Sequence, residues 1–342
     1  MRYDDETAKT AQLGCRTFRL IEILQKNKMM NKIRLALIAG GTSGEREISL
    51  RGAAGVEQAL HKNTYEVMRY DPATDLARLA ADADRLDVAF ILLHGIHGED
   101  GTVQGMLELL GIPYQGSGVL GSALAMNKNL AKVMYRLHGL PVATWEMAAK
   151  EHLADPTPLL AKLALPLVVK PVRQGSSLGM SIVRQPEQLA PALAKAFEHD
   201  SEVMVEEFIQ GREITVGVLG NEQLTALPLV EIIPDSRYDF FDYEAKYTPG
   251  ATREVCPAQV DESIRDKAQD YGIRAHKTLQ LRGYSRTDMI VRADGEIFLL
   301  ETNTIPGMTP TSLLPQAAAQ IGLDFPALLD RLIELAMERQ AI

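Results

Sequence analysis

The chain has 342 residues, of which 46% are hydrophobic and 24% are charged, a composition typical of a folded protein with two to three domains. Its net charge of −9 argues against a general binder of nucleic acid or of anionic membranes, although it leaves room for a local anion site. With only two cysteines, Cys15 and Cys256, the chain is no disulfide scaffold. Its acidic start argues against a secretory signal, and it has no apolar run of about 18 residues that could span a membrane. We therefore expect a cytoplasmic protein.

Residues 1–31 lack the alternation of a strand, and we interpret them as an N-terminal extension with no assigned function. From Lys32 onward, short apolar runs alternate with helical patterns, which is typical of a parallel sheet with crossover helices. The predicted elements of this first block are strands at 33–39, 67–70 and 88–93, a turn at 40–44 and a helix over 45–61. The loop 94–101 follows the third strand and is rich in glycine and polar residues, so it is a candidate wall of a site.

The pattern changes near residue 126, where a second block begins. The predicted helices are 127–137, a helix that contains 159–163, and 189–197; the predicted strands are 165–172, 180–184 and 203–209. Between the first two strands lies Gln174 to Gly179, which is longer and more flexible than a hairpin requires. Such a loop is usually a linker, but its backbone N–H groups and hydroxyls could also cover phosphates.

A third block begins near Glu213. It contains predicted strands at 214–219 and 224–232, a helix over 263–281, a hairpin around Asp294-Gly295 and an amphipathic end at 325–336. The polar stretch from about 234 to 257 has no core pattern, and a stretch of that length favours a lid. We therefore predict three α/β domains at 32–125, 126–212 and 213–342.

The hairpin carries the sharpest chemical prediction. If Asp294-Gly295 is a two-residue turn, Asp288 lies directly opposite Glu301, and Asn303 shares their face. Two carboxylates so close repel each other unless a cation lies between them, and hard oxygen ligands of this kind suit Mg²⁺. The alternative is a surface pair neutralised by Arg286 or Arg292.

A metal near phosphates implies a nucleotide, yet neither standard nucleotide-binding loop is present. The pattern GxxxxGK[ST] is absent, and the turn 40–44 does not fit GxGxxG. Lys170 and Lys128 are candidate cations for phosphates, and the carboxylates of Glu206 and Glu207 could accept hydrogen bonds from a base amine and a ribose hydroxyl. Glu45 lies at the start of a helix, where a carboxylate is favoured by the helix dipole even without a function.

Taken together, the motifs resemble those of D-alanine:D-alanine ligases of the ATP-grasp superfamily, in order from about Lys32 to the C-terminus. The motifs that carry the resemblance are Gly40-Gly41-Thr42-Ser43-Gly44-Glu45-Arg46-Glu47, Leu93-His94-Gly95, Glu99-Asp100-Gly101, Val169-Lys170-Pro171, Gly175-Ser176-Ser177-Leu178-Gly179-Met180, Asp242-Tyr243-Glu244-Ala245-Lys246-Tyr247 and Glu301-Thr302-Asn303-Thr304-Ile305-Pro306-Gly307-Met308-Thr309. The resemblance implies a Rossmann-like N-terminal domain with a parallel sheet, and two α+β domains that enclose ATP.

The resemblance also implies which residues bind the nucleotide and the metal. The implied ATP contacts are Lys128, Lys170, Ser176, Ser177, Glu206, Glu207, Phe208, Ile209, Glu213 and Lys246. Asp288, Glu301 and Asn303 would hold two Mg²⁺ ions, with Mn²⁺ as a substitute and Glu301 as the bridging ligand. This metal set agrees with the strand pairing, which was reached without the resemblance.

The reaction implied by the resemblance joins two D-alanine molecules for peptidoglycan precursors. The carboxylate of the first attacks the γ-phosphorus of ATP to give an acyl phosphate and ADP, and the amine of the second then displaces phosphate. Glu45 would hold the first ammonium group and be linked by hydrogen bonds to Ser176 and Tyr247, which closes the lid. The other implied roles are Lys246 at the γ-phosphate, Arg286 and Gly307 at the oxyanion, His94 at the pocket border, and Ser312 and Leu313 at the second substrate.

Three other interpretations compete with this one. A ligase for another amino acid or hydroxy acid would share the fold, although relatives that make D-alanyl-D-lactate carry other residues where Tyr247 stands. A catalytically silent nucleotide-binding regulator is disfavoured because the metal set, Arg286, Glu45 and the lid pair occur together. An NAD-dependent oxidoreductase lacks its GxGxxG fingerprint. The family resemblance adds the expectation of a homodimer.

Overall fold

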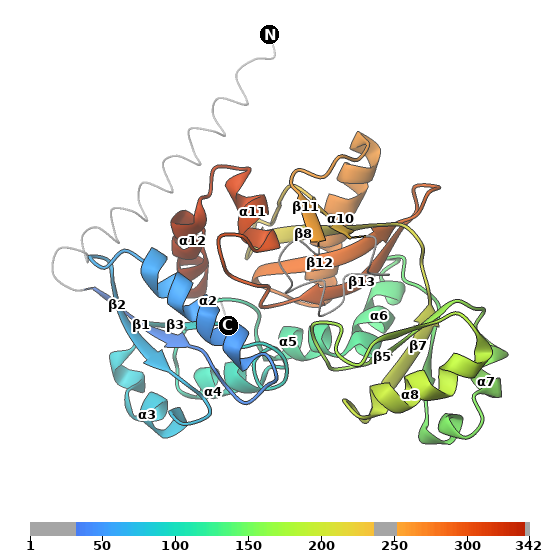
Figure 1. Cartoon of the computed structure of the whole chain (residues 1–342). Coiled ribbons are helices and arrows are strands. Elements are labelled where there is room, and N and C mark those ends of the chain that lie inside the picture. The colour runs from blue at the N-terminus through green and yellow to red at the C-terminus, as the bar shows by residue number, and fades with distance from the viewer. Residues whose placement is uncertain (1–31, 236–251, 339–342) are drawn as a thin grey trace, which may run out of the picture.

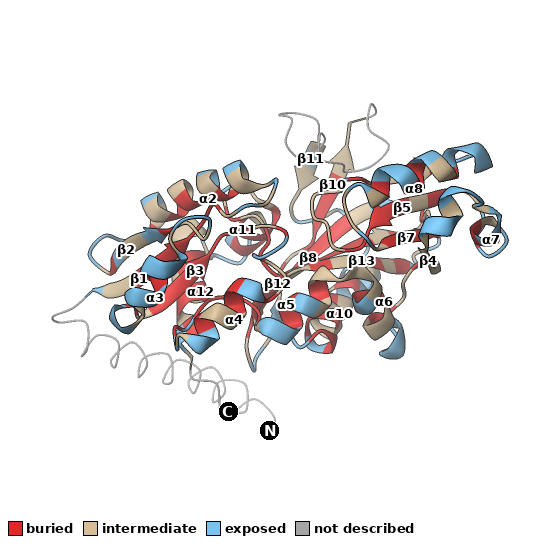
Figure 2. Cartoon of the chain, turned by 90° about the horizontal axis from the view of Figure 1, so that it is seen from below, coloured by how far each residue is buried: buried red, intermediate tan, exposed pale blue. Residues whose placement is uncertain are grey.

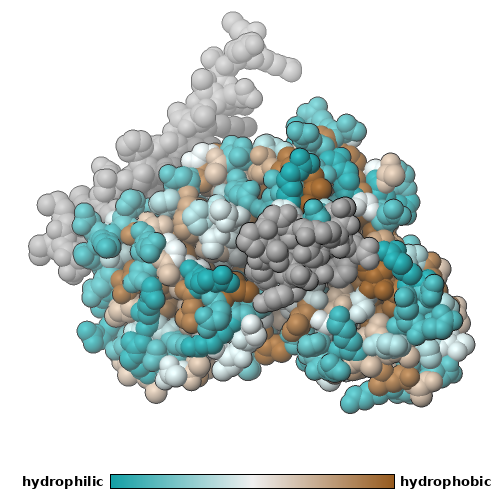
Figure 3. Space-filling view, in the orientation of Figure 1, coloured by the Kyte–Doolittle hydropathy of each residue, from teal (hydrophilic) through white to brown (hydrophobic). Residues whose placement is uncertain are grey.

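The structure, a computed structural model, describes residues 32–235 and 252–338. It contains three sheets arranged side by side, with helices packed on them (Figure 1). Buried residues line the strands, and exposed residues lie mainly on the outer faces of helices (Figure 2). On the face of Figure 1, hydrophilic side chains dominate the described surface, with smaller apolar patches between them (Figure 3).

The first sheet is parallel, as the alternation of apolar runs and helical patterns predicts. Its order is β2 (Tyr65–Tyr70), β1 (Ile33–Ile38), β3 (Val88–Ile91). The middle strand is buried on both faces, as is usual where helices cover a parallel sheet. One face packs against α2 (Arg46–Ala59), and the other packs against α3 (Leu76–Ala81) and α4 (Thr102–Leu109), which follow in the chain.

The second sheet is antiparallel, in the order β4 (Trp145–Ala148), β7 (Val203–Glu207), β5 (Leu167–Pro171), β6 (Ser181–Val183). Its core is completed by α8, which spans Leu189–Phe197 as predicted. The preceding helix α7 covers only Thr157–Leu160, so the prediction of a helix through residue 163 was too long at its end.

The third sheet is also antiparallel. Its strands are β11 (Thr252–Val255), β10 (Val230–Pro234), β8 (Arg212–Gly220), β12 (Gly283–Val291) and β13 (Ile297–Asn303), with the short β9 (Thr225–Ala226) against β8. One face packs on α10 (Glu262–Thr278), α5 (Val119–Met126) and α6 (Lys128–Leu137).

Two strand predictions in this sheet need correction. The expected single strand over 224–232 is two strands, β9 and β10, separated by a segment with Pro228, which has no backbone N–H to donate to a ladder. The stretch expected to be a lid without a core pattern contains β11 near its C-terminal end. Residues 236–251 of that stretch, with Lys246 and Tyr247, lie outside the described residues.

The last two helices connect the first and third sheets. α11 (Leu313–Ala319) and α12 (Phe325–Met337) share one apolar core with the first sheet, and the Tyr65 hydroxyl donates a hydrogen bond to Asp330 on α12. Figure 1 shows α12 beside α2, close to the first sheet. The end of the chain therefore packs on its N-terminal part. None of the helices in the described part of the chain has the length and apolarity needed to cross a bilayer.

Candidate active site

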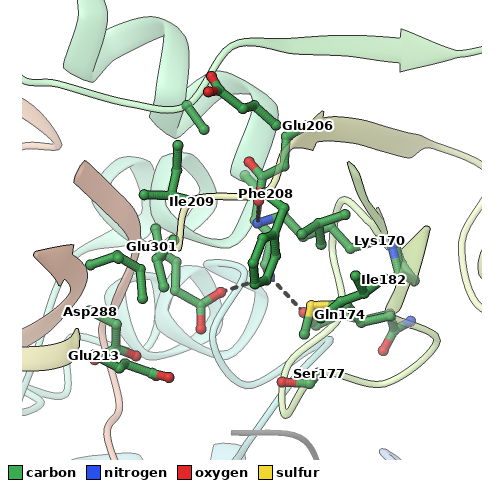
Figure 4. Close-up of a pocket in the computed structure, with 18 of the residues that line it drawn as sticks. Lys170, Gln174, Ser177, Ile182, Glu206, Phe208, Ile209, Glu213, Asp288 and Glu301 are labelled. Atoms are coloured by element: carbon green, nitrogen blue, oxygen red, sulfur yellow. Dashed lines mark hydrogen bonds and ion pairs between the residues drawn. The ribbon is translucent and has the colours of Figure 1, made fainter. Parts of the chain in front are cut away.

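A cleft of about 930 Å³ lies between the second and third sheets. Both apolar and polar side chains line it, as is usual in sites for small molecules. Eight of the predicted nucleotide contacts and both predicted metal carboxylates line it: Lys128, Lys170, Ser177, Glu206, Glu207, Phe208, Ile209, Glu213, Asp288 and Glu301. In Figure 4, Glu206 and Lys170 lie on one side of Phe208, and Asp288 and Glu213 lie together on the other. The folded chain thus assembles residues from the second and third sequence blocks.

Apolar side chains line the same cleft, and the sequence analysis missed them. They are Ala143, Val168, Met180, Ile182, Ile290 and Leu300. Such a surface suits the faces of a planar ring. Val168 and Ile182 are paired across β5 and β6, so strand alternation could have indicated them once the pairing was known.

At one end of the cleft, Glu206 is held between two lysines. Lys170 Nζ lies 2.5 Å from Glu206 Oε1, and Lys132 Nζ lies 2.8 Å from Oε2. Burial alone would raise the pKa of Glu206, but the two positive charges lower it to about 2, so the carboxylate is ionised. Lys132 was not among the predicted site residues.

At the other end, Asp288 is buried and surrounded by donors. It accepts two hydrogen bonds from Arg286, at 2.8 Å from Nε and 2.7 Å from Nη2, and one from Thr215 Oγ1 at 2.6 Å. Asn303 Nδ2 donates to it at 3.1 Å. Burial opposes the charge of Arg286, yet the carboxylate beside it raises the pKa of the guanidinium above its ordinary value. Asp288 is therefore buried, which contradicts the surface location in the alternative interpretation, but it is paired with Arg286 as that interpretation stated.

Asp288 and Glu301 are directly opposite each other, as predicted. The predicted turn, however, was wrong by one residue. Three residues, 293–295, connect Arg292 to Glu296, with Gly295 at φ 82°, and a bulge between Asp288 and Met289 shifts the register back by one. The bulge leaves Leu300 as the extra residue, and Leu300 lines the cleft.

Lys128 connects this end to the loop that precedes β6. Its ammonium lies 3.1 Å from Glu301 Oε2 and donates to the Gln174 carbonyl at 2.6 Å. Farther along this loop, Ser176 (φ 50°) and Ser177 (φ 57°) are both in the left-handed region, which side chains other than glycine rarely adopt. The loop is thus held in a specific, strained conformation rather than behaving as a linker.

Ser176 Oγ donates a hydrogen bond to Glu45 Oε1, so the loop contacts the residue before α2. A second cavity of about 1040 Å³ lies at this contact. It shares Gln174 and Leu178 with the first cleft, so the loop separates the two spaces. Its lining residues are Thr42, Ser43, Gly44, Glu45, Gly95, Ile96, His97, Gln174, Gly175, Ser176 and Leu178.

The loop 94–101 adds two titratable groups beside Glu45. Burial lowers the pKa of His94, and Glu45 opposes that shift. Burial raises the pKa of Glu99 to about 8, even though its carboxyl accepts a hydrogen bond from the Gly95 N–H. The loop ends at Gly101, directly before α4, with φ 92°. Only glycine fits there, because a Cβ would come within 2.6 Å of the Val119 carbonyl oxygen. Glu99 lay in a recognised motif but was not predicted as a site residue.

The remaining predicted residues lie at the start of α11. Ser312 precedes the helix and accepts a hydrogen bond from the Thr309 N–H at 3.1 Å. A Cβ at Gly307 would lie 3.1 Å from Ser312 Oγ, so the two residues are neighbours. Leu313 is buried in the core shared with the first sheet.

The donor chemistry at Asp288 fits a hard divalent cation. Asp288, Glu301 and Asn303 offer carboxylate and amide oxygens on one face of the hairpin. In the part of the chain that the structure describes, no three His, Cys, Asp or Glu side chains form a metal cage by themselves. Two carboxylates and an amide oxygen suit Mg²⁺, which uses one or two protein carboxylates and takes other ligands from water and phosphates.

Two family profiles match the chain. The profile described as D-ala D-ala ligase N-terminus matches residues 69–117, and the one described as D-ala D-ala ligase C-terminus matches residues 134–334. The D-alanine–D-alanine ligase of Desulfotalea psychrophila is 60% identical over 309 residues, covering 90% of this chain and 96% of that relative. The ligase of the same name from Syntrophobacter fumaroxidans is 59% identical over 307 residues, covering 90% and 98%.

Solved structures are similar over the same extent. The D-alanine–D-alanine ligase from Bacillus anthracis complexed with ATP has a TM-score of 0.78 at 35% identity, covering 89% of this chain and 97% of that one. The VanG D-Ala:D-Ser ligase from Enterococcus faecalis has a TM-score of 0.78 at 33% identity, covering 90% and 100%. The three-sheet arrangement is therefore shared with both.

Proposed function

The chain belongs to the D-alanine–D-alanine ligase family, and on that premise we propose that it joins two D-alanine molecules at the expense of ATP, for peptidoglycan precursors. The observation that carries this proposal is that one loop, residues 174–178, borders both the cleft and the second cavity. One side of the loop borders the cleft with Lys170, Asp288 and Glu301, and the other side borders the cavity with Glu45. A nucleotide and a small amino acid bound in these two spaces would meet at the loop.

ATP fits the first cleft in one direction. Its base would lie against the apolar residues near Phe208, within reach of the Glu206 carboxylate, and its ribose near Glu213. Its phosphates would then extend towards Lys128, Lys170 and the backbone of the 175–179 loop. The two ammonium groups and the backbone N–H groups favour a polyphosphate here, and the neighbouring carboxylates of Asp288 and Glu301 favour one that carries a metal ion.

Asp288, Glu301 and Asn303 would hold two Mg²⁺ ions, or Mn²⁺ in their place. When bound there, the metal neutralises phosphate charge and polarises the γ-phosphoryl group. Each of the two carboxylates has a cationic neighbour, Arg286 beside Asp288 and Lys128 beside Glu301, which holds the carboxylate in place at the cleft.

The first D-alanine would lie in the second cavity with its ammonium group on Glu45. Its carboxylate oxygen forms a bond to the γ-phosphorus while the bond from that phosphorus to the bridging oxygen of ADP breaks. Ser176 fixes the Glu45 carboxylate through its hydrogen bond, so the orientation of the first substrate depends on the loop. His94 would border this site.

The amine of the second D-alanine then attacks the acyl carbon, and phosphate leaves. Negative charge develops on the carbonyl oxygen in that step, and we assign its stabilisation to Arg286 and the Gly307 N–H. Ser312 and Leu313 would contact the second substrate, at its carboxylate and along its side. Lys246 and Tyr247 would complete the site from the lid, at the γ-phosphate and at Ser176.

The test is phosphate release from ATP and Mg²⁺ with D-alanine, L-alanine, D-alanine plus D-serine, and D-alanine plus D-lactate in parallel, with mass spectrometry of the products. Release that depends on D-alanine, with D-alanyl-D-alanine as the product, is expected. A mixed product formed in preference to the dipeptide would assign another second substrate, and no turnover with any of them would favour a silent homologue.

We also propose a homodimer. Leu109 at the end of α4 has 92% of its surface exposed, and Val119 and Leu120 at the start of α5, the helix that packs against α4, are exposed as well. Exposed apolar side chains on two neighbouring helices favour a second copy as their cover. Light scattering should give a dimer for the wild type and a monomer for Leu109→Glu.

We place the reaction in the cytoplasm because ATP is the cosubstrate and, within the described residues, Cys256 is a free thiol.

A further inference from the structure

Lys132 on α6 is a charged side chain with no assigned role. Its side chain is completely buried, which is rare for lysine unless it is paired. Within residues 32–235 and 252–338, Glu206 is its only ion-pair partner, and the ammonium group also lies 5.8 Å from the centroid of the Trp145 ring. Lys128, one helical turn earlier on the same face, reaches the cleft, but Lys132 does not line it.

Glu206 therefore has one more lysine than its charge requires. Each of its two oxygens faces one ammonium group, Oε1 that of Lys170 and Oε2 that of Lys132. Burying a second ammonium beside one carboxylate is unfavourable in itself, because the desolvation of an ion is only partly repaid by its partner. A residue in this position needs a reason other than neutralising Glu206 in the form seen here.

The two lysines differ in what else they can reach. Lys170 lines the cleft and its side chain is 10% exposed, whereas Lys132 has no access to the cleft. Lys170 can turn from Glu206 towards a phosphate by changing its rotamer. Lys132 can only stay where it is.

We propose that Lys132 is a positioning residue for base recognition: it stays on Glu206 Oε2 while Lys170 moves from Oε1 to the phosphates of the nucleotide. Oε1 is thereby released to accept a hydrogen bond from the 6-amino group of adenine. The inference rests on the proposed ATP site and adds to it the source of base selectivity. Lys132 contacts neither substrate nor metal and acts through Glu206.

The selectivity follows from the protonation state of Glu206. An ionised carboxylate only accepts hydrogen bonds, so it favours the amino group of adenine and repels the 6-oxo group of hypoxanthine. Without Lys132, departure of Lys170 would leave Glu206 buried and uncompensated. Lys170 would then stay on the carboxylate, or Glu206 would take up a proton and become able to donate to an oxo group. Both outcomes weaken the preference for adenine.

The experiment compares kcat/KM for ATP and for ITP in the wild type and in Lys132→Met, using the full chain with D-alanine and Mg²⁺. We expect the ATP-to-ITP ratio to fall about ten- to a hundredfold in the variant, the range for losing a hydrogen bond to a charged group. The matched control is Lys162→Met, which removes an exposed lysine paired with Glu146 at 3.0 Å in the same sheet region. Its ratio should equal that of the wild type.

A folded Lys132→Met variant that keeps the wild-type ratio would overturn the inference, even if its overall rate is low, because a purely structural role lowers both rates alike. An absent preference for ATP in the wild type would overturn it as well. If Lys132→Met does not fold, Lys132→Met/Glu206→Gln removes the uncompensated charge, and its ratio should match that of Glu206→Gln alone. A double variant with the wild-type ratio contradicts the inference. Failure of the proposed function is seen separately, as absence of any D-alanine-dependent ATP turnover in the wild type.

Discussion

The two ends of the cleft differ in which charged side chains they contain. At the base end, a single carboxylate, Glu206, lies between two ammonium groups. At the reacting end, the Asp288 carboxylate pairs with Arg286 and the Glu301 carboxylate pairs with Lys128, and both carboxylates line the cleft. At the base end, therefore, Lys170 can bind an anionic ligand. At the reacting end, the carboxylates of Asp288 and Glu301 can bind a metal ion.

This difference explains why the two ends respond differently to a ligand. The proposed exchange at the base end needs one lysine to turn, and the carboxylate it leaves keeps a partner. At the reacting end, by contrast, the carboxylates of Asp288 and Glu301 are the proposed ligands of an added metal ion. A polyphosphate with its metal complements both ends at once, because it brings negative charge for Lys170 and positive charge for Asp288 and Glu301.

The largest expected effect comes from removing a carboxylate at the reacting end. Asp288→Asn should lower turnover by about 10³-fold, because a bound metal supplies several kcal/mol of charge stabilisation. It should also raise the Mg²⁺ concentration for half-maximal activity. The matched control is Asp294→Asn at the exposed turn of the same hairpin, which should leave both values unchanged.

Steady-state rates measured over a Mg²⁺ titration check this prediction. An Asp288→Asn enzyme with the same Mg²⁺ dependence as the wild type would remove the distinction between the two ends, since the reacting end would then need no added cation.

Removing a cation from the reacting end should have the next largest effect. Arg286→Ala should lower kcat by roughly 10²-fold or more, as for loss of an oxyanion donor, with ADP affinity retained. It also leaves Asp288 buried without its guanidinium, so unfolding should become easier by about 3–5 kcal/mol. Calorimetric titration with ADP and denaturant unfolding separate the two effects. An equal loss of nucleotide affinity would place Arg286 on ATP instead.

A smaller effect is expected where the loop joins the two spaces. Ser176→Ala removes the hydrogen bond to Glu45 and should raise the KM for D-alanine about tenfold, with the KM for ATP within about twofold. Ser201→Ala, at an exposed bend of the same domain, is the control and should change neither. A change in the KM for ATP alone would mean that the loop serves only the nucleotide.

The last expected effect concerns stability rather than rate. Glu99 has its pKa raised to about 8 in the folded chain, so between its unfolded value near 4.5 and pH 8 the folded state binds the extra proton. Stability must then fall as pH rises through that window, by at most about 1.4 kcal/mol per pH unit. Glu99→Gln should flatten this slope in denaturant unfolding between pH 5 and 8. A slope as steep as that of the wild type would mean that Glu99 is already ionised.

The hairpin illustrates how far local sequence can predict a site. Alternation and the Asp294-Gly295 signal correctly placed Asp288 opposite Glu301, although the turn has three residues rather than two. The predicted turn was one residue too short, and the bulge between Asp288 and Met289 offset that error in the register. A bulge depends on how β12 packs against β8 as well as β13, and a single hairpin sequence does not contain that information.

Lys132 illustrates what the same reasoning misses. On a helix read in isolation, a lysine belongs on the solvated face, and Lys128 was noticed only as a candidate cation for phosphates. The burial of Lys132 depends on β7, which brings Glu206 to the same place from another part of the chain. The split of the expected strand at 224–232 had a local signal in Pro228, which was overlooked.

The sequence by itself determined the residue chemistry, the parallel first sheet, the longer helices and the pairing within the hairpin, because these depend on periodicity and on neighbours a few residues apart. The tertiary structure decided which groups meet: Ser176 with Glu45, Lys132 with Glu206, and the apolar residues that line the cleft. Such contacts join segments distant along the chain, and their geometry is set by packing of whole sheets and helices. No local pattern encodes that geometry, so the cation that holds a buried carboxylate becomes visible only when the chain is folded.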